Sequence, residues 1–80
     1  MNIWFKMPSG AKMSVAVGYG LYSTPREDNA SEYTHVEIGF PTGNIPESWA
    51  NYKDGSEEDS KTVFGYVPVE IMGEWFKLNS

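Results

Sequence analysis

Two side chains suited to acid–base chemistry, His35 and Glu37, lie two residues apart in a segment of alternating polar and apolar residues. Side chains at that spacing project from the same face of a β-strand, and an imidazole beside a carboxylate is a common general acid or base. The chain has no G-x-S-x-G motif and no serine in a triad pattern to supply a nucleophile. A small enzyme that uses His35 and Glu37 is therefore an alternative, and the sequence favours a protein without catalytic activity.

Motifs for metals and cofactors are absent or incomplete. The chain has no cysteine and one histidine, which leaves no Cys-based zinc site and no disulfide framework. The acidic segment 54–59 lacks the residue order of a calcium-binding EF-hand loop, and Gly18-Tyr19-Gly20 lacks the third glycine and the helix of a dinucleotide-binding fingerprint. We therefore expect neither a metal nor a cofactor.

The chain is acidic, and part of its negative charge is concentrated. Eleven Asp and Glu residues against six Lys and Arg residues give a net charge of −5, which argues against direct binding of nucleic acid. Four of the acids, Asp54, Glu57, Glu58 and Asp59, lie within six residues. Such a run usually forms a solvated loop, but carboxylates on a rigid surface can also take the place of phosphates in the basic groove of a nucleic-acid-binding protein.

Aromatic residues are abundant for so short a chain. Three Trp, five Tyr and four Phe make up 15% of the 80 residues, which is more than a small core needs, so some of the rings should remain on the surface. Trp and Tyr contribute most of the binding energy at many protein interfaces, and acidic rims set orientation and association rate. The predicted partner-contact residues are Trp4, Tyr22, Trp49, Glu57, Glu58 and Asp59.

A second hypothesis is a small-ligand site between the subunits of a homo-oligomer. Aromatic faces stack on bases, and Arg26 is the only guanidinium that could hold a phosphate through two hydrogen bonds. The polar segment 23–31 would close over such a site as a loop. In this alternative, the residues that bind a nucleotide-like ligand are Tyr19, Arg26, Tyr33 and His35.

The elements that would position these residues follow from the hydrophobic pattern. Alternating polar and apolar residues predict four strands, at 3–7, 13–17, 33–40 and 62–67, the first two forming an N-terminal β-hairpin. Pro46 followed by an acid predicts a short helix over 46–53. The segment 68–78 fits a strand or a helix, and its apolar spacing favours the helix. The sequence thus predicts an α+β fold in one domain, 1–80, with a small antiparallel sheet of about four strands.

Location and function follow from what the chain contains and lacks. No apolar segment reaches the length of a membrane span, and the N-terminus lacks the regions of a signal peptide. Together with the absence of cysteine, this predicts a cytoplasmic protein with no membrane partner. Short, acidic, aromatic-rich chains have the general character of phage and mobile-element accessory proteins. The sequence therefore predicts a small non-enzymatic binding protein that inhibits or sequesters a host protein, and this partner could itself bind nucleic acid.

Overall fold

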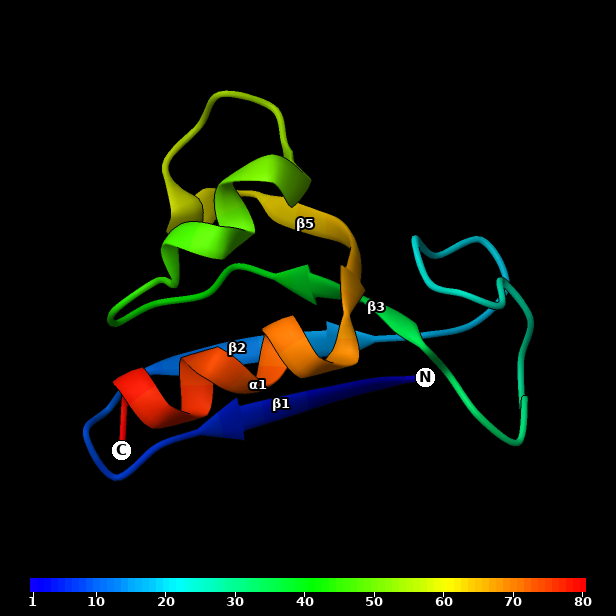
Figure 1. The fold of residues 1–80 in the computed structure, drawn as a ribbon, viewed down its shortest axis with the longest axis horizontal. Helices are drawn as coiled ribbons and strands as arrows, with labels where there is room; N and C mark the ends of the chain where they lie inside the picture. The colour runs from blue at the N-terminus through cyan, green and yellow to red at the C-terminus, as the bar shows by residue number, and fades with distance from the viewer.

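The fold is a five-stranded antiparallel sheet with a C-terminal helix across one face (Figure 1). The computed structural model describes all residues, 1–80. The strands are β1 (Asn2–Lys6), β2 (Lys12–Ala16), β3 (His35–Gly39), β4 (Lys53–Asp54) and β5 (Val63–Pro68). The helices are the two 3-10 helices η1 (Glu47–Tyr52) and η2 (Asp59–Lys61), and α1 (Val69–Leu78). The strand order β1-β2-β3-β5-β4 confirms the predicted α+β class and the N-terminal hairpin.

The hairpin of β1 and β2 forms because both strands alternate apolar and small or polar residues around a short turn. Five consecutive residue pairs, from Asn2 with Ala16 to Lys6 with Lys12, align without a bulge. Gly10 has φ +97, a left-handed conformation that glycine adopts without strain. The Phe5 ring meets the Phe76 ring of α1 edge to face with centroids 5.4 Å apart, so Phe5 lies on the side of the sheet that the helix covers. We call this side the helix face and the other side the open face.

Strand β3 is shorter than the predicted segment 33–40 because the chain changes conformation at Phe40. Phe40 has φ +53, which ends the extended backbone, and its ring is exposed. The alternation that placed Phe40 on the same side as the buried Val36 and Ile38 is therefore wrong for this residue. Beside β3, the register of β5 shifts between the pairs Val36 with Val67 and Ile38 with Phe64. This shift is a β-bulge in β5, formed by the residues between Phe64 and Val67.

The helix predicted over 46–53 is present as the 3-10 helix η1. Pro46 precedes it with extended backbone angles, and no side chain caps its first turn. Six residues are too few for a stable α-helix without tertiary support, and the chain leaves η1 directly into the two-residue strand β4. Strand β4 is the one strand that the sequence did not predict, because Lys53 and Asp54 show no apolar alternation. It raises the number of strands from the predicted four to five.

Two tryptophans fill the space between the sheet and the helices. Trp49 of η1 and Trp75 of α1 are fully buried, together with Phe64 of β5. The Trp49 indole N–H donates to the Ile71 carbonyl at 2.9 Å, and the Trp75 indole N–H donates to the Thr42 carbonyl at 3.1 Å. Each indole therefore fills core volume while its single polar group is paired. None of the helices has the length and apolar character needed to cross a membrane.

Candidate contact site

The two tryptophans predicted for a contact surface lie in different environments. Trp4 is 53% exposed on the edge strand β1, whereas Trp49 is completely buried. Trp49 is therefore not on the surface where the sequence analysis placed it, because η1 presses its indole against the Phe64 ring at a centroid distance of 5.6 Å. Trp4 also lies far from the acidic residues, since β1 and β4 are the opposite edges of the sheet. Four strand spacings, about 19 Å, separate those edges.

Three tyrosines instead gather at the β4–β5 edge of the sheet. They line an open hollow of about 400 Å³ that the end of η1, strands β4 and β5 and the loop before β3 form together. We call it the tyrosine hollow, and its lining residues are Tyr22, Asn51, Tyr52, Lys53, Asp54, Gly65 and Tyr66. Of the predicted contact residues, only Tyr22 lines it directly. The hollow thus gathers aromatic side chains from three separate parts of the chain.

The position of Tyr22 is fixed by contacts with β3 and β5. Its backbone N–H donates to Glu37 Oε1 at 3.2 Å, and its carbonyl accepts the Tyr66 N–H at 2.9 Å. Its ring covers Gly65 so closely that a Cβ on Gly65 would lie 3.1 Å from Tyr22 carbons. The missing side chain at Gly65 therefore makes the space in which the Tyr22 ring packs against the sheet.

The rings of Tyr22 and Tyr66 form a pair that faces solvent. Their centroids are 5.6 Å apart with a tilt of 31°, and the Arg26 guanidinium lies 5.7 Å from the Tyr22 centroid. The side chains are 38% and 40% exposed. Neither hydroxyl bonds to another atom of the chain, in contrast to the Tyr33 hydroxyl, which donates to the Glu27 carbonyl at 2.7 Å. The pair is therefore an ordered aromatic surface with two hydroxyl groups open to a partner.

Tyr66 occupies a backbone conformation that disfavours a large side chain. Its φ is +53, in the β-bulge of β5. For a bulky residue this region costs about 1 kcal/mol or more relative to glycine. Residues held in such conformations cluster at functional sites, and no buried contact requires a tyrosine here because the ring is exposed. The cost of this conformation is thus not offset by burial of the Tyr66 ring.

The substitution Tyr66→Gly separates stability from surface chemistry. It removes the backbone strain and also the contact with Tyr22, an aromatic pair worth about 0.5–1.5 kcal/mol. Because the two effects oppose each other, we expect the free energy of unfolding in urea to change by less than about 1 kcal/mol. A loss of about 3 kcal/mol would instead show that Tyr66 is held for folding rather than for contact with a partner.

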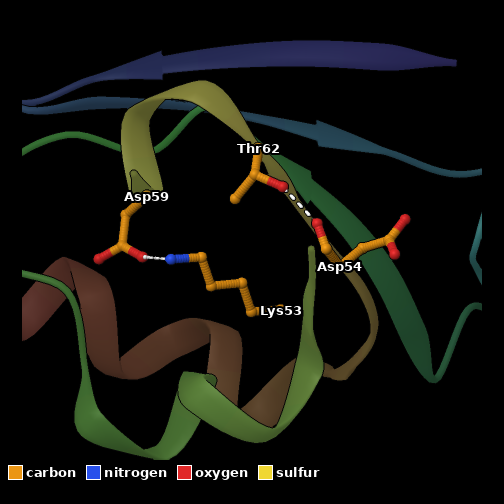
Figure 2. Close-up of polar contacts among 4 residues, drawn as sticks. All are labelled: Lys53, Asp54, Asp59 and Thr62. Carbon is orange, nitrogen blue, oxygen red and sulfur yellow. Dashed lines mark hydrogen bonds and ion pairs between the residues drawn. The ribbon is translucent and has the colours of Figure 1, made fainter. Parts of the chain in front are cut away.

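The acidic loop, residues 54–59, adjoins the hollow and is anchored at both ends. Figure 2 shows Lys53 and Asp59 pointing toward one another, with Lys53 Nζ 3.0 Å from Asp59 Oδ1. The Thr62 hydroxyl donates to the Asp54 carbonyl across the base of the same loop. The Asp54 side chain points away from the Lys53–Asp59 pair (Figure 2), because alternate residues of β4 face opposite sides of the sheet. Asp54 therefore belongs to both the acidic loop and the tyrosine hollow.

The acids of this loop differ in how free their charges are. Asp59 is paired with Lys53, and Glu58 lies 3.8 Å from Lys61, an exposed pair that contributes little to stability. The carboxylates of Asp54 and Glu57 make no ion pair within the chain and are exposed. The loop and the hollow together form a surface with aromatic rings at its centre and free negative charge beside them.

The two residues proposed for acid–base chemistry are not joined by a hydrogen bond. His35 Nδ1 lies 2.8 Å from the Thr34 hydroxyl, while the Glu37 carboxylate accepts the Tyr22 N–H. No ion pair joins His35 to Glu37. Glu37 therefore positions the Tyr22 loop, and His35 has a local partner of its own. No group of three or more potential metal ligands comes together in the structure.

The residues of the predicted ligand site are distributed rather than gathered. Tyr19 and Arg26 line one hollow of about 260 Å³, and Tyr33 lines another of about 390 Å³ that also contains Asp28. His35 lines neither. The Arg26 Nε–H donates to the Leu21 carbonyl at 2.9 Å, which uses one of the donors that a phosphate would need. The four residues thus do not form one pocket.

Sequence reasoning did not assign Tyr52 or Tyr66 to the contact surface. The available signal was Gly65, since a glycine inside a strand often marks a bulge or the close approach of another segment. Both occur here, because β5 bulges beside Gly65 and Tyr22 packs on it. Tyr52 carried no such signal, since its place in the hollow depends on the turn from η1 into β4.

The candidate site is assigned from the residues of this chain and not from a relative. No protein-family model, curated protein or solved structure matches the chain.

Proposed function

We propose that the protein is a non-enzymatic binding protein that takes up a basic segment of another protein on the tyrosine hollow and the acidic loop. The observation that carries this proposal is the ordered, solvent-facing Tyr22–Tyr66 pair beside the free carboxylate of Asp54. Tyrosines of this kind offer a large contact area at a low cost in conformational entropy. Carboxylates next to them favour a partner that presents Lys or Arg.

The chemistry of the hollow suits a guanidinium or ammonium group. A cation over a tyrosine ring is stabilised by about 0.5–1 kcal/mol at exposed sites and by more when desolvated. The contact of Arg26 with Tyr22 is an example of this geometry within the chain. A cation from a partner that enters between Tyr66 and Asp54 would meet a ring and a carboxylate together, with the tyrosine hydroxyls as hydrogen-bond partners.

Binding would inhibit a partner whose positive charge lies in the groove with which it binds nucleic acid. A basic groove that holds nucleic acid presents closely spaced Lys and Arg side chains, and the acidic loop places four carboxylates within six residues. The anchored ends of the loop favour binding because less conformational entropy is lost. A protein bound there would occlude the groove, which supports an inhibitory or sequestering role.

The test is affinity capture with matched baits. The site baits are the double variants Tyr22→Ala/Tyr66→Ala and Asp54→Asn/Glu57→Gln, and the control baits are Tyr19→Ala and Glu32→Gln. Tyr19 is 81% exposed and lines a different hollow, so its loss removes an aromatic ring without touching the site. Captured proteins are quantified by mass spectrometry, and far-ultraviolet circular dichroism confirms that every bait is folded.

We expect one or more basic proteins to bind the wild-type and control baits and to be depleted at least tenfold on both site baits, a loss of about 1.4 kcal/mol or more. Capture by the wild-type bait should also fall as the salt concentration rises, because charge pairing at an exposed surface is screened. If the proteins bound by wild type are retained equally by both site baits, the contact site is not the tyrosine hollow and the acidic loop.

A further inference from the structure

The outer edge of strand β1 is unpaired, and the hydrogen bonds to β2 show which of its backbone groups point outward. Met1 and Val17 exchange both backbone hydrogen bonds, at 2.7 and 2.9 Å, and the Met7 N–H donates to the Ala11 carbonyl at 2.8 Å. Because inward and outward groups alternate along an antiparallel strand, the odd-numbered residues of β1 bond to β2. The N–H and C=O groups of Asn2, Trp4 and Lys6 therefore point outward, away from the sheet.

We propose that this edge pairs with the same edge of a second copy of the chain, antiparallel and centred on Trp4, to form a two-fold symmetric dimer with a continuous ten-stranded sheet. The proposal goes beyond the proposed function and does not depend on it, because β1 and the tyrosine hollow are at opposite edges of the sheet. The inference rests on the backbone phase of β1, on its length and on the charges near it.

In this register every outward-facing backbone group of β1 has a hydrogen-bond partner. Trp4 lies opposite Trp4 of the second copy, and Asn2 lies opposite Lys6 of the second copy. All three are outward-facing positions, so each pair exchanges two hydrogen bonds. The three outward N–H groups and three outward C=O groups of each chain are then all paired, with no group left over on either strand. A shift of the register by one residue would place inward-facing groups opposite outward-facing ones.

The side chains also match in this register. Ile3, which is 46% exposed on the helix face, comes to lie opposite Phe5 of the second copy. This is a non-hydrogen-bonded pair, in which side chains approach most closely. The contact would extend the Phe5–Phe76 cluster across the dimer axis. On the open face, the two Trp4 side chains meet at the axis and cover each other.

No other part of this chain could pair with β1 over its whole length. The opposite edge strand, β4, has only two residues, so head-to-tail stacking of copies would leave most of β1 unpaired. Pro8, which lacks an N–H, stands at the next outward-facing position and limits the edge to Asn2–Lys6. An exposed, regular edge of this kind is a template for pairing with another chain, and β1 pairs with β2 without a bulge and carries its single charge, Lys6, at its last residue.

The negative charge that would oppose the approach of two copies lies away from β1. Residues 1–26 contain no Asp or Glu, and the acidic loop follows β4 at the far edge. The positive charges at this edge are Lys6, its neighbour Lys12 on β2 and the Met1 ammonium group, and Lys6 would lie opposite the neutral Asn2 of the second copy. The two Lys6 side chains would be about 14 Å apart along the paired strands, beyond the screening length of about 8 Å at physiological salt.

Sedimentation measurements on wild type and on charge variants of Trp4 test the proposal. A standard protein interface buries about 1,600 Å², and two paired strands of five residues bury less. We therefore expect a dimer, twice the 9.0 kDa of one chain, with a micromolar Kd. Because position 4 faces itself across the axis, Trp4→Glu alone and Trp4→Lys alone each place like charges together. Each should raise the Kd at least tenfold, about 1.4 kcal/mol, while an equimolar mixture of the two variants should dimerise again.

The matched control is Asn51→Glu, which adds the same charge at an exposed position beside β4, at the opposite edge of the sheet, and should leave the Kd of the dimer unchanged. A wild-type chain that is monomeric up to about 1 mM overturns the proposal, including the case in which an extended segment of another protein occupies the edge. A wild-type dimer that Trp4→Glu does not weaken overturns it as well. Failure of the mixed variants to associate, with both folded by circular dichroism, excludes the Trp4-centred register.

Discussion

Trp49→Ala removes most of the stability of the protein. Trp49 is completely buried, its ring packs on Phe64, and its indole N–H satisfies the Ile71 carbonyl. Replacing a buried tryptophan by alanine costs about 3–5 kcal/mol. A core of this size supplies only about 3–5 kcal/mol in all, so we expect the variant to be largely unfolded at 25 °C by circular dichroism and by urea titration.

Trp4→Ala is the matched comparison for this prediction. It makes the same change of residue at a site that is 53% exposed, so the monomer should lose less than about 1 kcal/mol. The measurement is made at low concentration, where association does not contribute. A Trp49→Ala protein that unfolds at the same urea concentration as Trp4→Ala would contradict the assignment of Trp49 to the core and would return it to the surface.

Asn79→Ala is expected to have the second-largest effect, because one buried side chain connects the end of the chain to the loop before η1. Asn79 Oδ1 accepts the Asn44 N–H at 2.7 Å, and Nδ2 donates to the carbonyls of Asn44 and Trp75 at 2.9 and 2.8 Å. Alanine would leave these backbone groups without partners, at a cost of about 1–3 kcal/mol. The melting temperature should fall by roughly 4–8 °C per kcal/mol.

The control is Asn51→Ala, since Asn51 is exposed and makes no hydrogen bond through its side chain. Its melting temperature should match wild type within about 2 °C, equivalent to less than 0.5 kcal/mol in a domain of about this size. Equal melting temperatures for the two variants would show that the Asn79 bridge contributes nothing to folding. A larger fall for Asn79→Ala supports a C-terminus that is part of the packed structure.

The sequence predicted the elements whose pattern is local. The hairpin follows from alternation at period two on both sides of a turn, and α1 begins directly after Pro68 with one face against the core. These signals do not depend on residues far away in the chain. The four strands that were predicted and the C-terminal helix accordingly agree with the structure to within about two residues, the usual uncertainty of element ends.

The features that sequence missed depend on contacts between distant segments. Whether a tryptophan is buried cannot be inferred from its type, and Trp49 is buried because η1 and α1 enclose it. Strand β4 exists because two residues pair with β5 and not because they alternate in polarity. The tyrosine hollow depends on a bulge in β5 that lets Tyr22 pack on Gly65. Of the proposed contact surface, the acidic run was visible as a local pattern, and Tyr22 was the one predicted aromatic residue that lines the hollow.

The affinity of a captured basic partner for wild type and for Tyr22→Ala/Tyr66→Ala, measured by calorimetric titration, tests the central claim most directly. In the proposed complex the rings would supply area and cation contacts at the centre of the site, so we predict a loss of about 100-fold, or 2.7 kcal/mol. The control Tyr19→Ala should bind within about threefold of wild type. Equal affinities of wild type and the double variant, with both proteins folded, would contradict the claim that the tyrosine hollow is the contact site.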